Sequence, residues 1–500
     1  MDVLQKLFRK HFGIPVESVH PLHGSLGASG RKIMRLSAQM PAGSAIGRRS
    51  RQANHTVTAL GVLYDVREEN VAFLEFSRHF RRHGLPVPEI YAEDLSHGAY
   101  LEQDLGDTTL FEFLSWHRSG PSIEAPVIEA YRKAVVLLPL FQVVAGRDLN
   151  YKVCYPRSSF DRQSIAWDLN YFKYYFLRPA GVPFNEQALE DDFRRLTRFL
   201  LKADRNYFLY RDFQSRNIML YRGEPFFIDY QGGRKGALQY DIASLLYDSK
   251  ADLPPHLRQQ LLDLYLDRLA DVLPNLRASA ARSRSRAAFM HYYYGYVYVR
   301  IMQALGAYGF RGFYERKTHF LQSVPYALRN IRWLLSNVEL PISLPTLTAA
   351  FQAMVAHEKL HGGVEKVGQL TVRISSFSFH RGLPADPTGH GGGFIFDARS
   401  LPNPGREDRF KSLTGKDPTV IEYLEREESV RQFLANATAL VESSIVNYQS
   451  RGFKNLMVSF GCTGGQHRSV YLAERLASHL RASSGVEVLV HHRELEKQPS

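Results

Sequence analysis

The chain has 500 residues, of which 44% are hydrophobic and 23% charged, a balance typical of globular rather than disordered proteins. This length predicts roughly two to four domains, and the net charge of +13 favours anionic partners such as nucleotides or RNA without choosing between them. Two cysteines exclude a disulfide framework, and no apolar run reaches the ~18 residues that span a bilayer, so we expect a cytoplasmic protein with no membrane partner.

The segment up to about residue 105 is predicted to be rich in β-structure. Its aromatic residues recur with a helical period after the second strand, which predicts one helix there. In chain order, the expected elements are a Gly/Ser loop at 22–31, strands at 32–36 and 56–64, a helix around Phe73 and Phe80, and a strand that ends at Leu105.

A helix-rich region is predicted from about 108 to 338, interrupted by short strands at 208–210, 218–221 and 226–230. After two prolines, an amphipathic segment at 347–360 predicts a linker helix, and we place the domain boundary near residue 365. After this boundary the sequence predicts strands that alternate with helices. The expected strands are 370–379, 394–398, 456–460 and 486–490, and the expected helices are 419–426, 429–450 and 469–483.

Asp212, Asn217 and Asp229 predict a phosphoryl-transfer site. Asn217 follows Asp212 by five residues on a loop that enters a strand, and Asp229 ends the next apolar strand. Phosphoryl transfer needs a carboxylate to orient the acceptor hydroxyl, the role predicted for Asp212, and oxygen ligands for Mg²⁺, the role predicted for Asn217 and Asp229. The alternative is that Asp212 caps a turn and Asp229 only ends a strand. Asp241 is expected to pin this loop.

Two further segments are candidates for nucleotide binding. Glycines let backbone N–H groups approach a phosphate and serines add hydroxyl donors, although such loops often only turn a hairpin. The candidates in the Gly/Ser loop are Gly24, Ser25, Gly27, Ser29 and Gly30. Gln103 and Asp104 lie between the two predicted lobes, where a kinase-type hinge would meet the adenine.

A glycine-rich loop joins the strand at 456–460 to the helix at 469–483. Successive backbone N–H groups and a helix N-terminus form an anion site, and Arg468 can add a bidentate contact. The spacing of Cys462 and Arg468 also fits a cysteine-dependent phosphatase, in which the thiolate attacks phosphorus. A third interpretation is that the glycines only permit close packing of helix on strand. The candidate phosphate ligands are Cys462, Thr463, Gly464, Gly465, Gln466, His467, Arg468 and Ser469.

Residues from about 10 to 340 resemble the aminoglycoside phosphotransferase family, and within it the bacterial kinases of cell-wall amino sugars. The matching pieces are the Gly/Ser loop, Glu69-Asn70-Val71-Ala72-Phe73-Leu74, Gly84-Leu85-Pro86-Val87-Pro88-Glu89-Ile90, the hinge segment and the Asp212, Asn217 and Asp229 set. The resemblance implies an α+β, protein-kinase-like two-lobe fold, with an N-lobe at 1–105 and a helical C-lobe at 106–340. It also implies ATP and Mg²⁺ as cofactors and a small sugar such as N-acetylglucosamine or N-acetylmuramate as acceptor.

The same resemblance assigns Glu69 to the nucleotide site and places Asp168, in the segment 167–172, facing the acceptor sugar, with core packing as the alternative. The chain departs from the family in two places. Tyr210-Arg211-Asp212 stands where many relatives have His before the Asp with one residue between, and the strand at 56–64 has no lysine to pair with Glu69. Lys32 or Arg31 could substitute for that lysine.

Residues from about 368 to 500 resemble the C-terminal domain of RapZ, the bacterial RNase adapter protein. The shared strings lie at 396–404, 413–418, 461–470 and 492–497. The resemblance implies a smaller α/β domain after a linker at 341–367. Such a domain binds a hexosamine phosphate and a small regulatory RNA and self-associates into homo-oligomers. Asp397 and Arg399 would then lie near the bound phosphate.

Three functional hypotheses follow. The first is an ATP- and Mg²⁺-dependent sugar kinase whose C-terminal domain senses a hexosamine phosphate, favoured by Asp212, Asn217 and Asp229. The second is a non-catalytic adaptor that binds nucleotide and RNA, favoured by the missing strand lysine and the RapZ-like tail. The third is a phosphatase that uses Cys462.

Overall fold

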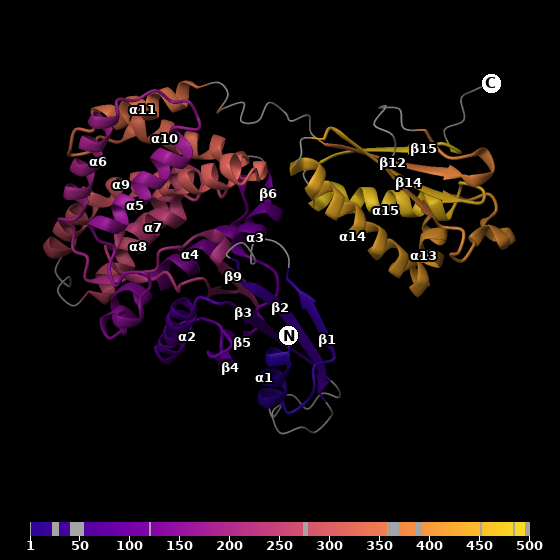
Figure 1. The fold of residues 1–500 in the computed structure, drawn as a ribbon, viewed down its shortest axis with the longest axis horizontal. Helices are drawn as coiled ribbons and strands as arrows, with labels where there is room; N and C mark the ends of the chain where they lie inside the picture. The colour runs from indigo at the N-terminus through magenta and orange to yellow at the C-terminus, as the bar shows by residue number, and fades with distance from the viewer. Residues whose placement is uncertain are drawn as a thin grey trace. The chain divides into compact units, whose positions relative to one another are not determined.

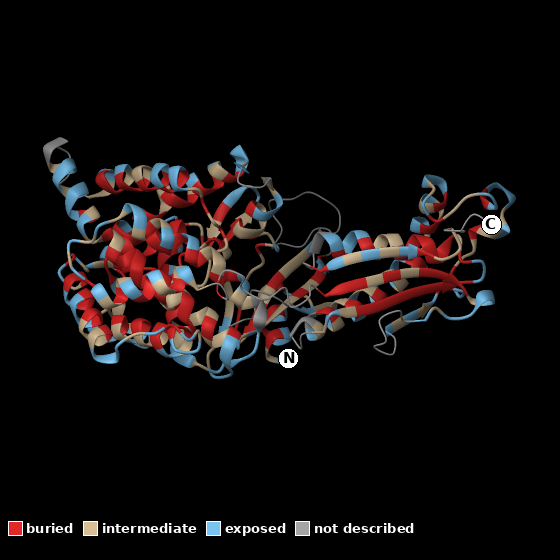
Figure 2. Cartoon of the chain, turned by 90° about the horizontal axis from the view of Figure 1, so that it is seen from above, coloured by how far each residue is buried: buried red, intermediate tan, exposed pale blue. Residues whose placement is uncertain are grey.

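The computed structural model describes residues 2–22, 30–40, 55–119, 122–273, 279–357, 360, 370–385, 393–450, 453–483 and 486–495. The chain forms two compact units. The first holds residues 1–310 and 326–356, and the second holds residues 311–325 and 357–500. Buried side chains gather inside each unit (Figure 2).

An antiparallel sheet in the order β1-β2-β3-β5-β4 opens the first unit (Figure 1). Helix α1, which the sequence analysis did not predict, packs Leu4 and Phe8 into the core of this sheet. Gly61 permits the contact, because a Cβ there would lie 2.6 Å from Leu36 Cδ1 and 2.9 Å from Leu4 Cδ1. The elements are α1 (Asp2–Phe12), β1 (Ser18–Pro21), β2 (Lys32–Met40), β3 (His55–Leu63), α2 (Arg67–Arg82), β4 (Ile90–Asp94) and β5 (Ala99–Gln103).

The rest of the first unit is mainly helical and contains the short strand pairs β6–β7, β8–β11 and β9–β10. The strands are β6 (Arg118–Ser119), β7 (Ser122–Ile123), β8 (Tyr207–Leu209), β9 (Ile218–Tyr221), β10 (Glu224–Phe227) and β11 (Arg234–Gly236). The helices are α3 (Leu110–Trp116), α4 (Ala125–Pro139), α5 (Arg162–Phe172), α6 (Glu186–Leu200), α7 (Gln239–Leu246), α8 (Pro255–Val272), α9 (Ser279–Gly309), α10 (Val324–Asn337) and α11 (Pro345–Ala356).

Two details of this unit differ from the sequence expectations. Strand β10 ends at Phe227, so Asp229 lies beyond the strand, and its φ of +67° is a left-handed conformation that a strand residue does not adopt. Helix α11 falls within the segment expected to be a linker, yet its Leu347 and Phe351 are buried and it belongs to the first unit. The backbone N–H of Leu347 donates to Asp192 Oδ2 at 2.9 Å, which ties the start of α11 to α6.

The second unit is an α/β domain around a parallel sheet in the order β13-β14-β12-β15. Strand β14 is buried from Leu456 to Cys462, as expected for a central strand covered by helices. Cys462 pairs with Ser378 and Gly461 with Asp397, so the ends of three strands meet at one edge. The elements are β12 (Thr371–Ser378), β13 (Gly393–Asp397), α13 (Pro418–Arg426), α14 (Glu428–Ser450), β14 (Asn455–Cys462), α15 (Arg468–Ser483) and β15 (Glu487–His492).

Candidate active site and anion loop

Asn217 joins the two predicted aspartates of the active site. Its Nδ2 donates to Asp229 Oδ2 at 3.1 Å and to the main-chain oxygen of Asp212 at 2.8 Å. The β9–β10 hairpin accounts for this convergence, because the backbone N–H of Ile228 donates to the Asn217 carbonyl at 3.1 Å. Asn217 and Asp229, which are 12 positions apart in the sequence, therefore lie side by side.

The charge of this cluster suits a cation. Burial, and then the negative charge of Asp212, raise the pKa of Asp229 to about 6. Gln231 Nε2 donates to Asp229 Oδ1 at 2.5 Å, and this hydrogen bond lowers the pKa of Asp229. Two carboxylates and an amide that crowd together in this way match the hard oxygen donors that Mg²⁺ prefers, so Asn217 and Asp229 fit the group predicted for them.

Asp241, at the start of α7, holds the loop that carries Asp212. Its Oδ2 accepts the backbone N–H of Tyr210 at 2.8 Å, and its Oδ1 accepts the backbone N–H of Arg211 at 3.0 Å. Gln142 Nε2 adds a third hydrogen bond at 3.0 Å. Asp241 is fully buried, and burial raises its pKa to about 7. The predicted role of Asp241 in pinning the loop is confirmed.

Asp168 contacts the residue next to Asp212. Its carboxylate pairs bidentately with Arg211, with Asp168 Oδ2 2.7 Å from Arg211 Nη1 and Oδ1 2.6 Å from Nη2. Arg211 has φ of +84° and also lies near the rings of Phe160 and Tyr240. Asp168 is only 5% exposed, so its principal partner in this structure is Arg211 rather than an open acceptor pocket.

Arg31 is the residue that pairs with Glu69. The sequence analysis had named Arg31 and Lys32 as the two possible substitutes for the missing strand lysine. Arg31 Nη2 lies 2.9 Å from Glu69 Oε2, and Arg31 Nη1 lies 3.8 Å from Asp229 Oδ1. Its guanidinium also covers the ring of Tyr64 at 4.6 Å. Lys32, by contrast, is exposed at the start of β2. Of the two cations proposed to replace the strand lysine, Arg31 is the one that reaches Glu69.

Three of the remaining nucleotide candidates, Gly30, Gln103 and Asp104, fall within the described residues. Gly30 precedes Arg31 with φ of +78°, whereas Gly24, Ser25, Gly27 and Ser29 lie outside the described residues. Gln103 ends β5, and its Oε1 accepts the backbone N–H of Glu89 at 3.3 Å. Asp104 binds Arg35 through Nε at 2.7 Å and Nη2 at 3.0 Å, a contact that the sequence analysis missed because the two residues are 69 positions apart.

The glycine-rich loop of the second unit lies between β14 and α15. Cys462 Sγ accepts the backbone N–H of Gly465 at 3.2 Å and lies 3.2 Å from Ser469 Oγ. Gly465 has φ of +70°, and a Cβ there would lie 2.8 Å from the backbone nitrogen of Ser378. Only glycine fits this turn. Thr463 and Gly464 are exposed at the tip of the loop.

The larger side chains of the loop bind neighbouring backbone. Arg468 Nη1 donates to the carbonyls of Arg399 at 2.9 Å and Leu401 at 2.8 Å, and its Nη2 lies 3.3 Å from Thr463 Oγ1. Gln466 Nε2 donates to Leu413 O at 2.6 Å, and His467 Nε2 lies 2.8 Å from Phe410 O. These contacts hold the Arg468 guanidinium beside the loop, while its Nε is buried and has no hydrogen-bond partner among the described residues. The phosphate-binding role of Arg468 stays a prediction.

Asp397 and Arg399 pair with each other beside the loop. Arg399 Nε lies 2.9 Å from Asp397 Oδ1, and its Nη2 lies 2.6 Å from Oδ2. Hydrogen bonds from Arg399 hold the pKa of Asp397 below its usual value. Both side chains are exposed at the same sheet edge as Cys462, near the residues that the sequence analysis grouped with them.

Comparisons with known proteins agree with this two-part organisation. Residues 63–279 match the model of the phosphotransferase enzyme family, and residues 370–496 match the model of the RapZ C-terminal domain. The match to family models at these positions, together with the two-lobe arrangement, establishes the predicted α+β kinase-like fold followed by an α/β domain. None of the helices in the described part of the chain is long and apolar enough to cross a membrane.

Curated relatives are named nucleotide-binding proteins. One from Thioalkalivibrio sulfidiphilus is 39% identical over 171 residues, which is 34% of this chain and 58% of the relative. One from Xylella fastidiosa (strain M23) is 41% identical over 128 residues, which is 26% of this chain and 42% of the relative. The chain thus spans about half the length of the curated relatives that it matches.

The comparison with solved structures finds the following two proteins, both at low identity. A choline kinase from Cryptosporidium parvum has a TM-score of 0.42 and 10% identity, covering 70% of this chain and 99% of that one. An ADP-bound aminoglycoside phosphotransferase has a TM-score of 0.35 and 11% identity, covering 72% of this chain and 98% of that one. On the family matches, the chain carries a phosphotransferase-family domain at residues 63–279 and a RapZ C-terminal domain at residues 370–496.

Proposed function

We propose that the first unit is an ATP- and Mg²⁺-dependent kinase of a small sugar of the N-acetylhexosamine or N-acetylmuramate type, and that the C-terminal domain senses a hexosamine phosphate. The observation that carries the kinase proposal is the contact of Asn217 with both Asp212 and Asp229 beside the Arg31–Glu69 pair. The phosphotransferase-family match supports nucleotide use.

In this mechanism Asp212 orients the acceptor hydroxyl and takes its proton as the sugar oxygen bonds to the γ-phosphorus and ADP leaves. Asn217 and Asp229 would hold Mg²⁺, which supplies positive charge to the phosphates when bound. Arg31 would contact the phosphates while Glu69 fixes its position. Arg31 Nε is buried and has no hydrogen-bond partner among the described residues, which supports a ligand in this place.

The test is ADP formation with N-acetylglucosamine, N-acetylmuramate and glucosamine, followed by NMR of the product. The expected result is one sugar that releases ADP above the sugar-free rate and gains one phosphate. If none does so at saturating Mg²⁺ and ATP, the sugar-kinase proposal is wrong.

Replacing Arg31 should lower kcat/KM for ATP more than replacing its neighbour Lys32. We expect Arg31→Ala to lower kcat/KM for ATP by about 10- to 100-fold, because a buried charge-assisted contact contributes about 1.5–3 kcal/mol. The matched control is Lys32→Ala, since Lys32 is exposed. Steady-state kinetics with varied ATP would measure both. A larger loss in Lys32→Ala than in Arg31→Ala would contradict the assignment.

The raised pKa of Asp229 predicts a pH-dependent requirement for Mg²⁺. Below its pKa of about 6 the carboxyl is protonated and no longer ligates a cation. The Mg²⁺ concentration for half-maximal ADP formation should therefore rise about fivefold from pH 6 to pH 5 and stay nearly level above pH 7. A Mg²⁺ requirement that is constant from pH 5 to 7.5 would contradict this prediction.

The RapZ C-terminal domain supports a second candidate, a regulatory adaptor that binds RNA and forms homo-oligomers. An RNA-binding protein that contacts several phosphates loses affinity steeply as salt rises. Filter binding of a structured RNA at several salt concentrations would test this. Binding that is absent, or that does not change with salt, would remove RNA as a partner.

A further inference from the structure

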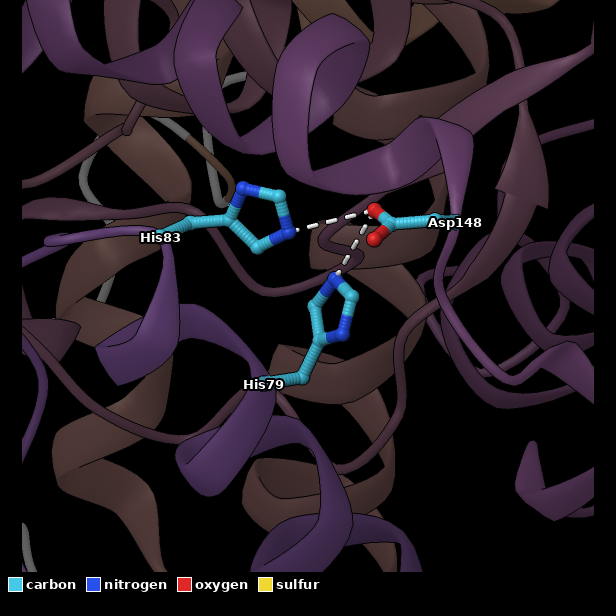
Figure 3. A group of neighbouring side chains, drawn as sticks. All are labelled: His79, His83 and Asp148. Carbon is cyan, nitrogen blue, oxygen red and sulfur yellow. Dashed lines mark ion pairs between the residues drawn. The ribbon is translucent and has the colours of Figure 1, made fainter.

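Two histidines and an aspartate that the proposed mechanism does not use converge in the first unit. His79 lies in the last turn of α2, and His83, four residues later, caps the C-terminus of that helix. Asp148 follows the short helical turn Ala145–Arg147. Figure 3 shows both imidazoles turned toward one carboxylate. Asp148 Oδ1 lies 3.1 Å from His83 Nε2 and 3.5 Å from His79 Nε2.

Hydrogen bonding alone explains only part of this arrangement. His79 Nε2 lies 2.8 Å from the carbonyl oxygen of Ala145, so a proton on this nitrogen is already directed to that carbonyl. A neutral imidazole carries a single N–H, and this one is already donated to Ala145. His79 Nε2 therefore has no second proton to donate to Asp148 Oδ1. An ion between these atoms would account for both contacts.

Two of the distances lie on either side of the edge of a tetrahedral metal site, and the third is shorter. Zinc bound to nitrogen and oxygen at ~2.0–2.1 Å has ligand–ligand edges of roughly 3.3 Å. The observed separations are 2.8, 3.1 and 3.5 Å, and the ligand atoms of all three side chains lie within 4.8 Å of one another.

We propose that His79, His83 and Asp148, with the Ala145 carbonyl as a fourth ligand, bind a divalent transition-metal ion of the zinc class. The ion would join α2 to the segment that follows α4. Helix α2 also carries Glu69 in its first turn, and Glu69 pairs with Arg31, so metal occupancy would hold the helix that positions Arg31. The proposal requires no catalytic activity of the chain.

The test uses the full chain after removal of metal with a chelator. Co²⁺ replaces zinc and gives intense visible d–d absorption only when it is four-coordinate, so a Co²⁺ titration reports this geometry directly. We expect saturable four-coordinate absorption that Zn²⁺ displaces, and a loss of about tenfold or more in affinity in His83→Ala and in Asp148→Ala. Both side chains are partly exposed, with 27% and 65% of the side-chain surface accessible, so the variants should fold.

The matched control is His97→Ala. His97 pairs with Asp94 at 2.8 Å in an exposed histidine–aspartate contact, and in the part of the chain that the structure describes no third histidine, cysteine or carboxylate groups with them. Its replacement should leave the Co²⁺ spectrum unchanged. A second readout is the melting temperature followed by tryptophan fluorescence, which Zn²⁺ should raise in the unmodified chain but not in Asp148→Ala. If His83→Ala and Asp148→Ala bind Co²⁺ with the same spectrum and affinity as the unmodified chain, the proposal is wrong.

Discussion

Replacing Asp212 by asparagine is expected to lower kcat for ADP formation by about 10²- to 10⁴-fold, the contribution typical of a general base. Asparagine keeps the size of the side chain but cannot take the proton of the acceptor hydroxyl. The hydrogen bond from Asn217 reaches the main-chain oxygen of Asp212, so the loop should keep its conformation. Steady-state ADP release with the best acceptor sugar measures the effect.

Asp204→Asn is the matched control for this experiment. Asp204 is exposed on the loop before β8 and accepts the backbone N–H of Asn206 at 3.1 Å. Its replacement should leave kcat within about twofold of the unmodified chain, because surface substitutions of this kind rarely alter a protein by more than ~0.5 kcal/mol. If Asp212→Asn also retained kcat within that margin, Asp212 would not be the base.

Asp168→Ala is expected to destabilise the first unit by about 3 kcal/mol, because it leaves the largely buried guanidinium of Arg211 without its carboxylate partner, with only the hydrogen bond to Tyr240 OH remaining. Trp116, Trp167 and Trp333 are the three tryptophans of the chain, and all lie in the first unit. Urea denaturation followed by tryptophan fluorescence therefore reports on this unit without a signal from the C-terminal domain.

The matched control for Asp168 is Asp191→Ala. Asp191 pairs with Arg194 on the surface of α6, and exposed pairs contribute about 0.2–1 kcal/mol. The same pair of variants separates the two interpretations of Asp168. If Asp168 only contacts the acceptor sugar, Asp168→Ala should raise KM for the sugar. Its free energy of unfolding should then stay close to that of the Asp191→Ala chain. Such a result would restore the substrate-binding role and contradict the positioning role.

The sequence contained the information for the active-site cluster because its members are close along the chain. Asp212, Asn217 and Asp229 fall within one loop and one hairpin, and such local geometry follows from strand and turn patterns. Helix α1 also had a visible signal, since Leu4, Leu7, Phe8 and Phe12 recur at helical spacing and are buried. Helix α11 was predicted to be a linker, although its apolar residues also suit a core. Its contact with α6 in the structure shows that it belongs to the core of the first unit.

The ion pairs could not be predicted, because each joins residues that only the tertiary fold brings together. Arg31 and Glu69 are 38 positions apart, and Asp168 and Arg211 are 43 apart. Composition cannot distinguish Arg31 from its neighbour Lys32. In the C-terminal loop the pattern correctly predicted a turn between strand and helix. It did not predict that Arg468 would bind two backbone carbonyls, because those carbonyls lie 67 and 69 positions earlier in the chain.

The proposed replacement of a strand lysine by Arg31 would also alter the reactivity of the proposed nucleotide site. A guanidinium stays protonated at any physiological pH and is a poor nucleophile, whereas a lysine amine can be acylated. Strand β3 has the sequence HTVTALGVL, and Lys32 is directed to solvent at the start of β2. Covalent ATP analogues that acylate a lysine amine in a nucleotide site would therefore leave this chain unmodified at Arg31, which offers a way to distinguish it from lysine-bearing kinases in a mixed sample.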